Sequence, residues 1–325
     1  MDFSVSRALW LMARTAPCLG LRALVYLGMA VAYILVTGLG AGIGFGLGGF
    51  GGPDARLGGA FWGGAIGFGL IAGILYLLRE YVLYAVKAGH LAVLVELMDN
   101  RPLPEGQGQV AYGTAVVRAR FKETSVLFGI DQLAKGVIRA VTGLARGIAD
   151  LIPLPGMDAL ATLIGAFLRI GVGFVDEVIL AHAIRHRATD PWASAREALV
   201  LYAQNHGAML RNAAVLALIT YGLAFVVFLL LLAPAAALAF LMPGGCSAAG
   251  VLFALILAWG VKAALLEPLA IACMMQAFFA VTDGQAPDPA WDARLDSLSG
   301  KFRELKDRAA NSLGTPIPVS PWVRS

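Results

Sequence analysis

Four stretches of this chain each reach the roughly 20 apolar residues that a helix needs to cross a bilayer. They cover residues 23–45, 58–78, 213–232 and 250–281, and the first three contain no charged residue. Over the whole chain, 59% of residues are hydrophobic and 14% are charged, whereas about a quarter are charged in a soluble domain. This composition excludes a disordered chain, a disulfide scaffold and a secreted globular enzyme. We predict an all-α, multi-pass helical membrane protein.

Basic residues are distributed unevenly around the four stretches. With the N-terminus inside, the connections 46–57 and 233–249 lie outside and hold one basic residue between them, Arg56. Lys262 lies within a span, and every other lysine and arginine falls inside. Because basic residues favour the cytoplasmic side, the pattern predicts four spans with both termini in the cytoplasm.

A fifth apolar stretch, residues 157–184, complicates this topology. It carries four charged residues: Asp158, Arg169, Asp176 and Glu177. A fifth crossing would break the inside–outside alternation, so we expect a membrane-embedded or re-entrant helical hairpin hinged near Gly171 and Gly173, or a helix packed against the spans. Two further spans within residues 81–184 would restore the alternation, and six spans are therefore the alternative.

These features divide the chain into four parts. Residues 1–78 hold a short interfacial helix and the first transmembrane hairpin, and residues 79–211 hold amphipathic and membrane-embedded helices on the cytoplasmic side. Residues 212–282 form the second hairpin, and residues 283–325 form an amphipathic helix followed by a flexible tail.

Two amphipathic segments lie outside the predicted spans. The segment 130–148 has apolar residues every three or four positions and a mostly basic opposite face, which suits either anionic lipid at the cytoplasmic surface or packing on the protein's own bundle. The second segment carries an apolar stripe that consists of Trp291, Leu295, Leu298, Phe302 and Leu305. This stripe is compatible with self-association or with docking at the membrane interface.

Glycine recurs at every fourth position in the first two predicted spans. In lipid, small residues at this spacing let two helices approach closely. The pattern predicts helix packing within the hairpin, at a subunit interface of a homo-oligomer, or along a pore. The rows that we expect to pack are Gly38, Gly42 and Gly46 in the first span and Gly59, Gly63 and Gly67 in the second, with Gly40, Gly44 and Gly48 at the same spacing.

Two charged residues lie inside the fourth predicted span. Lys262 and Glu267 are five residues apart, about 140° around an ideal α-helix, so we expect that they do not face each other. A charge within a span is costly and is usually paired or functional. We predict that Glu267 finds a partner on another helix or faces a hydrated cavity, where a cation could also meet Trp259. The alternative is an ion pair that only orders the bundle.

Asp176 and Glu177 are further candidates for a binding site, because they follow the predicted glycine hinge. Their alternative role is structural, at the cytoplasmic boundary. His182 and His186 share a helix face at the spacing of a metal site, but Arg185 and Arg187 crowd them with positive charge, so no metal is predicted.

Gly44, Gly46 and Gly49 have the spacing of a dinucleotide-binding fingerprint, but they lack a preceding strand and an acid to bind ribose. Catalytic motifs are missing, and we expect no enzyme activity, no cofactor and no nucleic-acid partner.

The segment from residue 194 to 205 resembles part of the choline transporter-like family. There, an amphipathic helix of similar pattern precedes the last two spans. The resemblance covers roughly residues 190–285 and implies transport of a small organic cation or lipid precursor. The matching positions are Ser194, Ala195, Arg196, Ala198, Leu201 and Asn205.

Two hypotheses for function follow from the sequence. The first is a non-enzymatic, transport-type protein for a small organic cation or a lipid-related solute. The second is an oligomeric membrane scaffold that assembles through its glycine rows and its C-terminal amphipathic helix. They make different predictions for Glu267, which the first hypothesis needs and the second does not.

Overall fold

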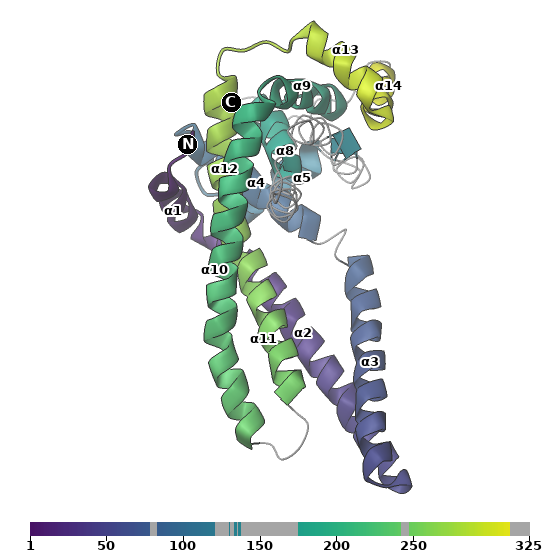
Figure 1. The fold of residues 1–325 in the computed structure, drawn as a ribbon. Helices are drawn as coiled ribbons and strands as arrows, with labels where there is room; N and C mark the ends of the chain where they lie inside the picture. The colour runs from purple at the N-terminus through teal and green to yellow at the C-terminus, as the bar shows by residue number, and fades with distance from the viewer. Residues whose placement is uncertain are drawn as a thin grey trace, which may run out of the picture. The chain divides into compact units, whose positions relative to one another are not determined.

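The structure, a computed structural model, describes residues 1–78, 83–120, 175–241 and 247–312, together with isolated positions between 130 and 137. Every regular element in these residues is helical (Figure 1). The predicted all-α architecture is therefore confirmed. The segment 157–174 with Gly171 and Gly173, most of the basic segment 130–148, and the tail after residue 312 lie outside the described residues.

The described helices vary widely in length. Helix α10 is the longest, with 36 residues, and α2 has 33. A 3₁₀ turn, Gly49–Gly51, follows α2, and a π-helical turn, Lys262–Leu266, joins α11 to α12. The helices are α1 (Val5–Arg14), α2 (Ala16–Gly48), α3 (Pro53–Leu78), α4 (Tyr84–Met98), α5 (Gln109–Arg120), α8 (Val175–Arg185), α9 (Pro191–Gln204), α10 (His206–Leu241), α11 (Ser247–Val261), α12 (Glu267–Thr282), α13 (Pro289–Leu298) and α14 (Gly300–Ser312).

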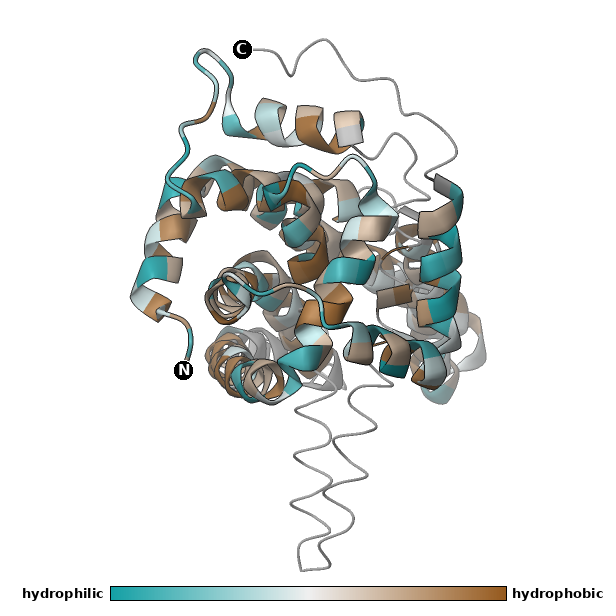
Figure 2. Ribbon diagram, turned by 90° about the horizontal axis from the view of Figure 1, so that it is seen from above, coloured by the Kyte–Doolittle hydropathy of each residue, from teal (hydrophilic) through white to brown (hydrophobic). Residues whose placement is uncertain are grey.

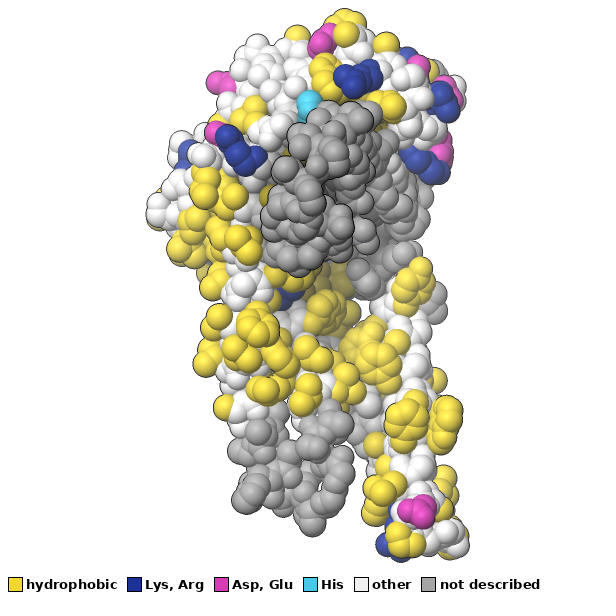
Figure 3. Space-filling model, in the orientation of Figure 1, with side chains coloured by type: hydrophobic (Ala, Val, Ile, Leu, Met, Phe, Trp, Pro, Cys, Tyr) yellow, Lys and Arg dark blue, Asp and Glu magenta, His cyan; other side chains and the backbone are white. Residues whose placement is uncertain are grey.

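Four helical segments are long and apolar enough to cross a membrane. In each of the first three segments, 17% of the most apolar 18-residue stretch is buried. In the fourth segment, 28% of that stretch is buried. Figure 3 shows many hydrophobic side chains on the visible face of α2, α3, α10 and α11, with charged side chains at the lower end of α3. Lipid is the solvent that suits such surfaces, and the chain is a multi-pass helical membrane protein. The four segments are Ala16–Gly51, Pro53–Tyr76, His206–Pro234 and Gly250–Thr282.

The chain divides into two compact units. Unit 1 contains residues 1–18, 85–219 and 269–325, and unit 2 contains residues 19–84 and 220–268. Each unit therefore combines segments that are far apart in the sequence.

In unit 1, helix α9 packs against α8, α13 and α14. Leu295, Phe302 and Leu305 of the C-terminal stripe are fully buried, whereas Leu298 is 40% exposed. The stripe therefore packs on the protein's own α9, an arrangement that differs from both self-association and docking at the membrane. Figure 2 shows hydrophilic and hydrophobic residues mixed along the helices of this unit, as expected for helices that bury one face.

Ion pairs reinforce the contact between α9 and the C-terminal helices. Arg196 of α9 donates a hydrogen bond to Asp292 of α13 at 2.7 Å, and Lys306 of α14 lies 3.5 Å from the same carboxylate. The hydrogen bond from Arg196 lowers the pKa of Asp292. Arg308 of α14 stacks over the ring of Trp192 at 5.0 Å. These contacts fix how the stripe docks on α9.

In unit 2, glycines hold α2 and α3 together as a hairpin. A Cβ atom added at Gly44 would overlap the backbone carbonyl of Gly59, and one added at Gly40 would overlap that of Gly63. The same overlaps arise in reverse from Gly59 and Gly63, and an added Cβ at Gly67 would meet the carbonyl of Val36. The two backbones are thus in direct contact at Gly59, Gly63 and Gly67.

Of the two glycine rows of α2 at this spacing, the row of Gly40, Gly44 and Gly48 forms this contact. An added Cβ at Gly38, Gly42 or Gly46 would meet open space among the described residues. These glycines lie two positions from Gly40, Gly44 and Gly48, about 200° around the helix, and so point away from α3. Their predicted packing within the hairpin is wrong, whereas packing against another subunit stays a prediction.

Candidate functional site

Lys262 and Glu267 form an ion pair in unit 2. The Lys262 Nζ atom donates to Oε1 of Glu267 at 2.8 Å. Both side chains are mostly buried, with 14% and 19% exposure respectively. The prediction that these residues do not face each other is wrong, and with it the expectation that Glu267 finds its partner on another helix.

The pairing arises from the backbone between the two residues. The N–H of Glu267 donates to the carbonyl of Lys262, five residues earlier, which is the hydrogen bond of a π-helical turn. This turn is wider than an α-helical turn. It therefore returns the fifth residue to the face on which Lys262 lies, where a regular α-helix would place it about 140° away.

The position of Pro268 gives a physical reason for the π turn. Proline has no N–H, and in an α-helix its ring clashes with the carbonyl four residues earlier. That residue is Ala264, which lies within the π turn. The wider turn thus lies where an α-helix would have this clash. Proline residues and π-helical turns are both known places at which helices kink.

An aromatic ring completes the surroundings of the Lys262 ammonium group. Its Nζ atom lies 4.6 Å from the ring centroid of Tyr221 on α10, within the range of a cation–π interaction. The ammonium group is thus held by one carboxylate and one aromatic face. Both are groups that recognise organic cations.

Trp259, the aromatic residue predicted for this role, has a different contact. Its ring lies edge-on to that of Tyr26, with centroids 6.1 Å apart, and the residue is 38% exposed. Tyr26 is buried together with Ala263 and Ala264 of the π turn. Trp259 therefore packs beside the turn, and the ring that faces the ammonium group is that of Tyr221.

Asp176 and Glu177 belong to unit 1 and not to the unit that holds Lys262, Trp259 and Glu267. Both lie in the first turn of α8, where negative charge complements the helix dipole. Both are buried, and Glu177 accepts from Lys87 of α4 at 3.1 Å. These contacts favour the structural role over the binding role.

His182 and His186 lie on one face of the α8 end, as their spacing predicts. Their ring centroids are 4.1 Å apart, and Nε2 of His182 lies 3.8 Å from a carboxylate oxygen of Glu197. Among the residues that the structure describes, no three histidine, cysteine or acidic side chains are grouped as metal ligands. Burial lowers the pKa of His182 to about 3, with the positive charges of His186 and Arg185 adding to the effect.

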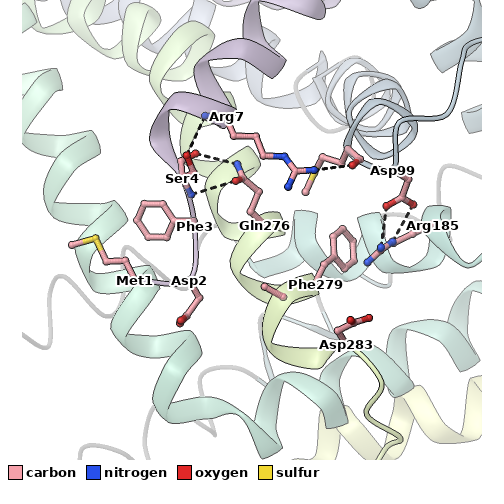
Figure 4. Close-up of a pocket in the computed structure, with 12 residues that line it drawn as sticks. Met1, Asp2, Phe3, Ser4, Arg7, Asp99, Arg185, Gln276, Phe279 and Asp283 are labelled. Carbon is pink, nitrogen blue, oxygen red and sulfur yellow. Dashed lines mark hydrogen bonds and ion pairs between the residues drawn. The ribbon is translucent and has the colours of Figure 1, made fainter.

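Unit 1 also contains a pocket of about 470 Å³ formed by α1, α4, α8 and α12 (Figure 4). Its wall includes Gln276 and Phe279 of α12, which are both buried. Gln276 accepts a hydrogen bond from the backbone N–H of Ser4, which fixes the start of α1 against α12. The pocket thus lies where the N-terminal segment meets the end of a candidate span.

Two arginines reach the same corner of the pocket. Arg7 donates to the carbonyl of Met98 at 3.0 Å, and Arg185 bonds the neighbouring Asp99 through both Nε and Nη2, at 3.1 and 2.9 Å. The Arg185 guanidinium also stacks over the ring of Phe279 at 4.3 Å. Polar groups and an apolar wall therefore line one cavity.

Signals in the sequence for these additional residues are weak. Gln276 is a polar residue within an apolar run, and Arg7 interrupts the apolar residues of the short N-terminal helix. Tyr221 carried no signal, because an aromatic residue in a span is ordinary. Its role depends on a contact between helices that the sequence pattern does not report.

No protein-family model, curated protein or solved structure matches the chain. The candidate sites are therefore defined by the geometry of the chain itself.

Proposed function

We propose that this protein is a non-enzymatic, transport-type membrane protein for a small organic cation, with Glu267 and Tyr221 as its cation site. One observation supports the proposal above others. Within a candidate span, the Lys262 ammonium group lies between a carboxylate at 2.8 Å and an aromatic ring at 4.6 Å. An alkylammonium solute would need the same two groups.

Lys262 is then a tethered competitor for the site. When an alkylammonium or quaternary ammonium solute arrives, it takes over the contacts with Glu267 and Tyr221, and the lysine side chain withdraws. The π turn supports this proposal, because such turns are frequent at functional sites. Intramembrane charges likewise often mark solute pathways.

The resemblance to the choline transporter-like family supports the same class of solute. It covers roughly residues 190–285, a range that includes Tyr221, Lys262 and Glu267. In this proposal, both termini lie in the cytoplasm, as the distribution of basic residues favours.

Chemical rescue tests this proposal. In Lys262→Ala, the Glu267 carboxylate loses its partner, so added propylammonium, tetramethylammonium or choline should bind there and raise the melting temperature. The wild-type protein should show a smaller shift, because Lys262 competes. Lys262→Ala/Glu267→Gln has no carboxylate to satisfy and is the matched control, which should not respond to any of these cations.

Two outcomes would contradict the proposal. In the first, no cation stabilises Lys262→Ala more than it stabilises the double variant. In the second, a cation stabilises both variants equally, which would locate its binding away from Glu267. Flux of the stabilising cation into vesicles that contain the wild-type protein then separates transport from binding alone.

An oligomeric membrane scaffold is the second candidate function. The open row of Gly38, Gly42 and Gly46 on α2 favours it, since small residues on a lipid-facing helix suit a helix–helix contact. The buried C-terminal stripe removes one of the two surfaces on which that hypothesis relied.

A further inference from the structure

The pocket of unit 1 is bordered by segments that lie at the ends of candidate spans. Gln276, Phe279 and Ala280 line it from the last two turns of α12, and the candidate span Gly250–Thr282 ends beside them. On the other side, Arg7 belongs to α1, which is separated from the candidate span Ala16–Gly51 by Thr15 alone. If both segments cross a bilayer, their ends and the pocket beside them lie towards the lipid headgroups.

Helix α1 has the character of a helix that lies in the membrane interface. One face is buried through Ala8, Leu11 and Met12. Leu9 and Trp10 of the same helix are about half exposed, at 54% and 47%. Exposed tryptophan with flanking arginines is typical of segments at headgroup level.

The charges around the pocket leave an excess of positive charge in its Arg7–Arg185 corner. Asp99 is shared between Arg185 and Arg101, with contacts at 2.9 and 3.0 Å. Arg101 also pairs with Glu96, so these two arginines share two carboxylates and the excess positive charge of the corner comes from Arg7. Arg7 is exposed and uses one donor group on the carbonyl of Met98, which leaves other N–H groups for a ligand.

The remaining acids that line the pocket are Asp2 and Asp283. Asp2 accepts from Asn212 at 2.7 Å and lies 3.3 Å from Arg211, and the hydrogen bond from Asn212 lowers its pKa. Its negative charge is therefore matched. Asp283 is exposed at the rim, just after the end of α12, and it opposes an anion to some degree.

We propose that this pocket binds the phosphate group of an anionic ligand through Arg7 and Arg185, and that the ligand at this depth is an anionic phospholipid headgroup. Guanidinium groups match phosphate oxygens in charge and geometry. Phe279 holds Arg185 in place by stacking, and the Asp99 pair fixes the plane of its guanidinium group. The site lies in unit 1 and is independent of the cation site at Glu267.

Binding of short-chain phosphatidylglycerol to the full-length protein in a neutral detergent tests the proposal. Native mass spectrometry and thermal shift should detect phosphatidylglycerol bound more tightly than a diacylglycerol of equal chain length, which lacks phosphate. Arg7→Gln should weaken binding about tenfold, the effect of one lost charge-assisted hydrogen bond. Arg14→Gln, on the same helix but outside the pocket, should leave binding unchanged.

Two further variants separate the cavity from surface charge. Ala280→Trp would fill the pocket without changing charge and should abolish binding, whereas Asp283→Asn should tighten it by removing a repelling carboxylate. Glycerol 3-phosphate in the same assay distinguishes a soluble phosphate from a lipid: binding of either ligand with these variant effects supports the phosphate site. Equal loss in Arg7→Gln and Arg14→Gln, normal binding to Ala280→Trp, or no preference over diacylglycerol would overturn it.

Discussion

Lys262 and Glu267 lie five residues apart in one candidate transmembrane segment, yet their side chains pair at 2.8 Å because the backbone between them makes a π-helical turn. The pair neutralises two charges that lipid would otherwise make costly. The contact through which Glu267 neutralises Lys262 is also the contact that an organic cation would take over in the proposed function.

The first prediction concerns the strength of this pair. Glu267→Gln or Lys262→Met alone should strongly destabilise the protein, by up to about 3–5 kcal/mol, because each strands a mostly buried charge. The double variant Lys262→Met/Glu267→Gln should recover most of the loss. Unfolding of all four proteins in mild detergent gives the coupling energy. If the two single losses simply add in the double variant, the two residues do not interact.

The second prediction concerns the glycine contact in the α2–α3 hairpin. Gly44→Ala should destabilise the hairpin by about 1–3 kcal/mol, as overpacking does, because the new Cβ would overlap the backbone of Gly59. Gly42→Ala is the matched control on the opposite face and should be neutral or slightly stabilising, since alanine favours a helix over glycine. Melting temperatures of the two variants test this predicted difference. Equal effects would mean that the hairpin does not use the Gly44 face.

The third prediction concerns the buried histidine of α8. The pKa of His182 is about 3 in the folded protein, against an ordinary value of 6.5. Between these values the unfolded chain binds a proton that the folded protein does not, so stability is full above about pH 6.5 and is lost progressively as the pH falls towards 3. His182→Leu should flatten this part of the stability profile.

Melting temperatures measured across that pH range, for the wild type and for His182→Leu, test the assignment. His186→Leu is the control, because His186 is exposed and its loss should preserve most of the slope. An unchanged slope in His182→Leu would assign the acid sensitivity to other groups.

The fourth prediction concerns the docking of the C-terminal helices on α9. Phe302→Ala should cost about 3–5 kcal/mol, the usual effect of truncating a buried aromatic side chain, since Phe302 is fully buried. Leu298→Ala, at a half-exposed position of the same stripe, should have a much smaller effect. Limited proteolysis of α13 and α14 should be accelerated in the first variant. Equal resistance in both variants would show that α14 is not held by this contact.

The fifth prediction concerns membrane orientation. In a background without the three native cysteines, since Cys246 lies in the outside connection 233–249, a cysteine at Ala55 in the charge-poor connection 46–57 should react with a membrane-impermeant thiol reagent added outside. A cysteine at Ser312 should react only after the membrane is permeabilised. The opposite labelling pattern would invert the topology.

Sequence reasoning located the membrane helices well because a span needs only length and apolar composition. Three of the four predicted stretches fall within candidate spans of the structure, and the stretch 58–78 extends past the span Pro53–Tyr76 only at its end. The end of the fifth stretch, residues 175–184, forms most of α8, which packs on α9. Local sequence patterns were enough to predict an element wherever its contact with lipid or water determines its structure.

The sequence does not show which of two equivalent helix faces forms a contact. The rows containing Gly42 and Gly44 have the same spacing, and only the approach of α3 selects Gly44. Likewise, an apolar stripe such as that of Leu295 and Phe302 shows that a face will be covered, but α9 is identified as the covering helix only in the folded chain.

The helical class, the four candidate membrane spans and the two charges within one of them follow from the amino-acid sequence alone. That these charges meet does not follow from it, because a projection on regular α-helical geometry assigns Lys262 and Glu267 to different faces. The π turn before Pro268 and the ring of Tyr221 beside the ammonium group are features of the folded chain. Hydropathy is a property of each segment, whereas pairing depends on backbone geometry and on contacts between helices distant in sequence.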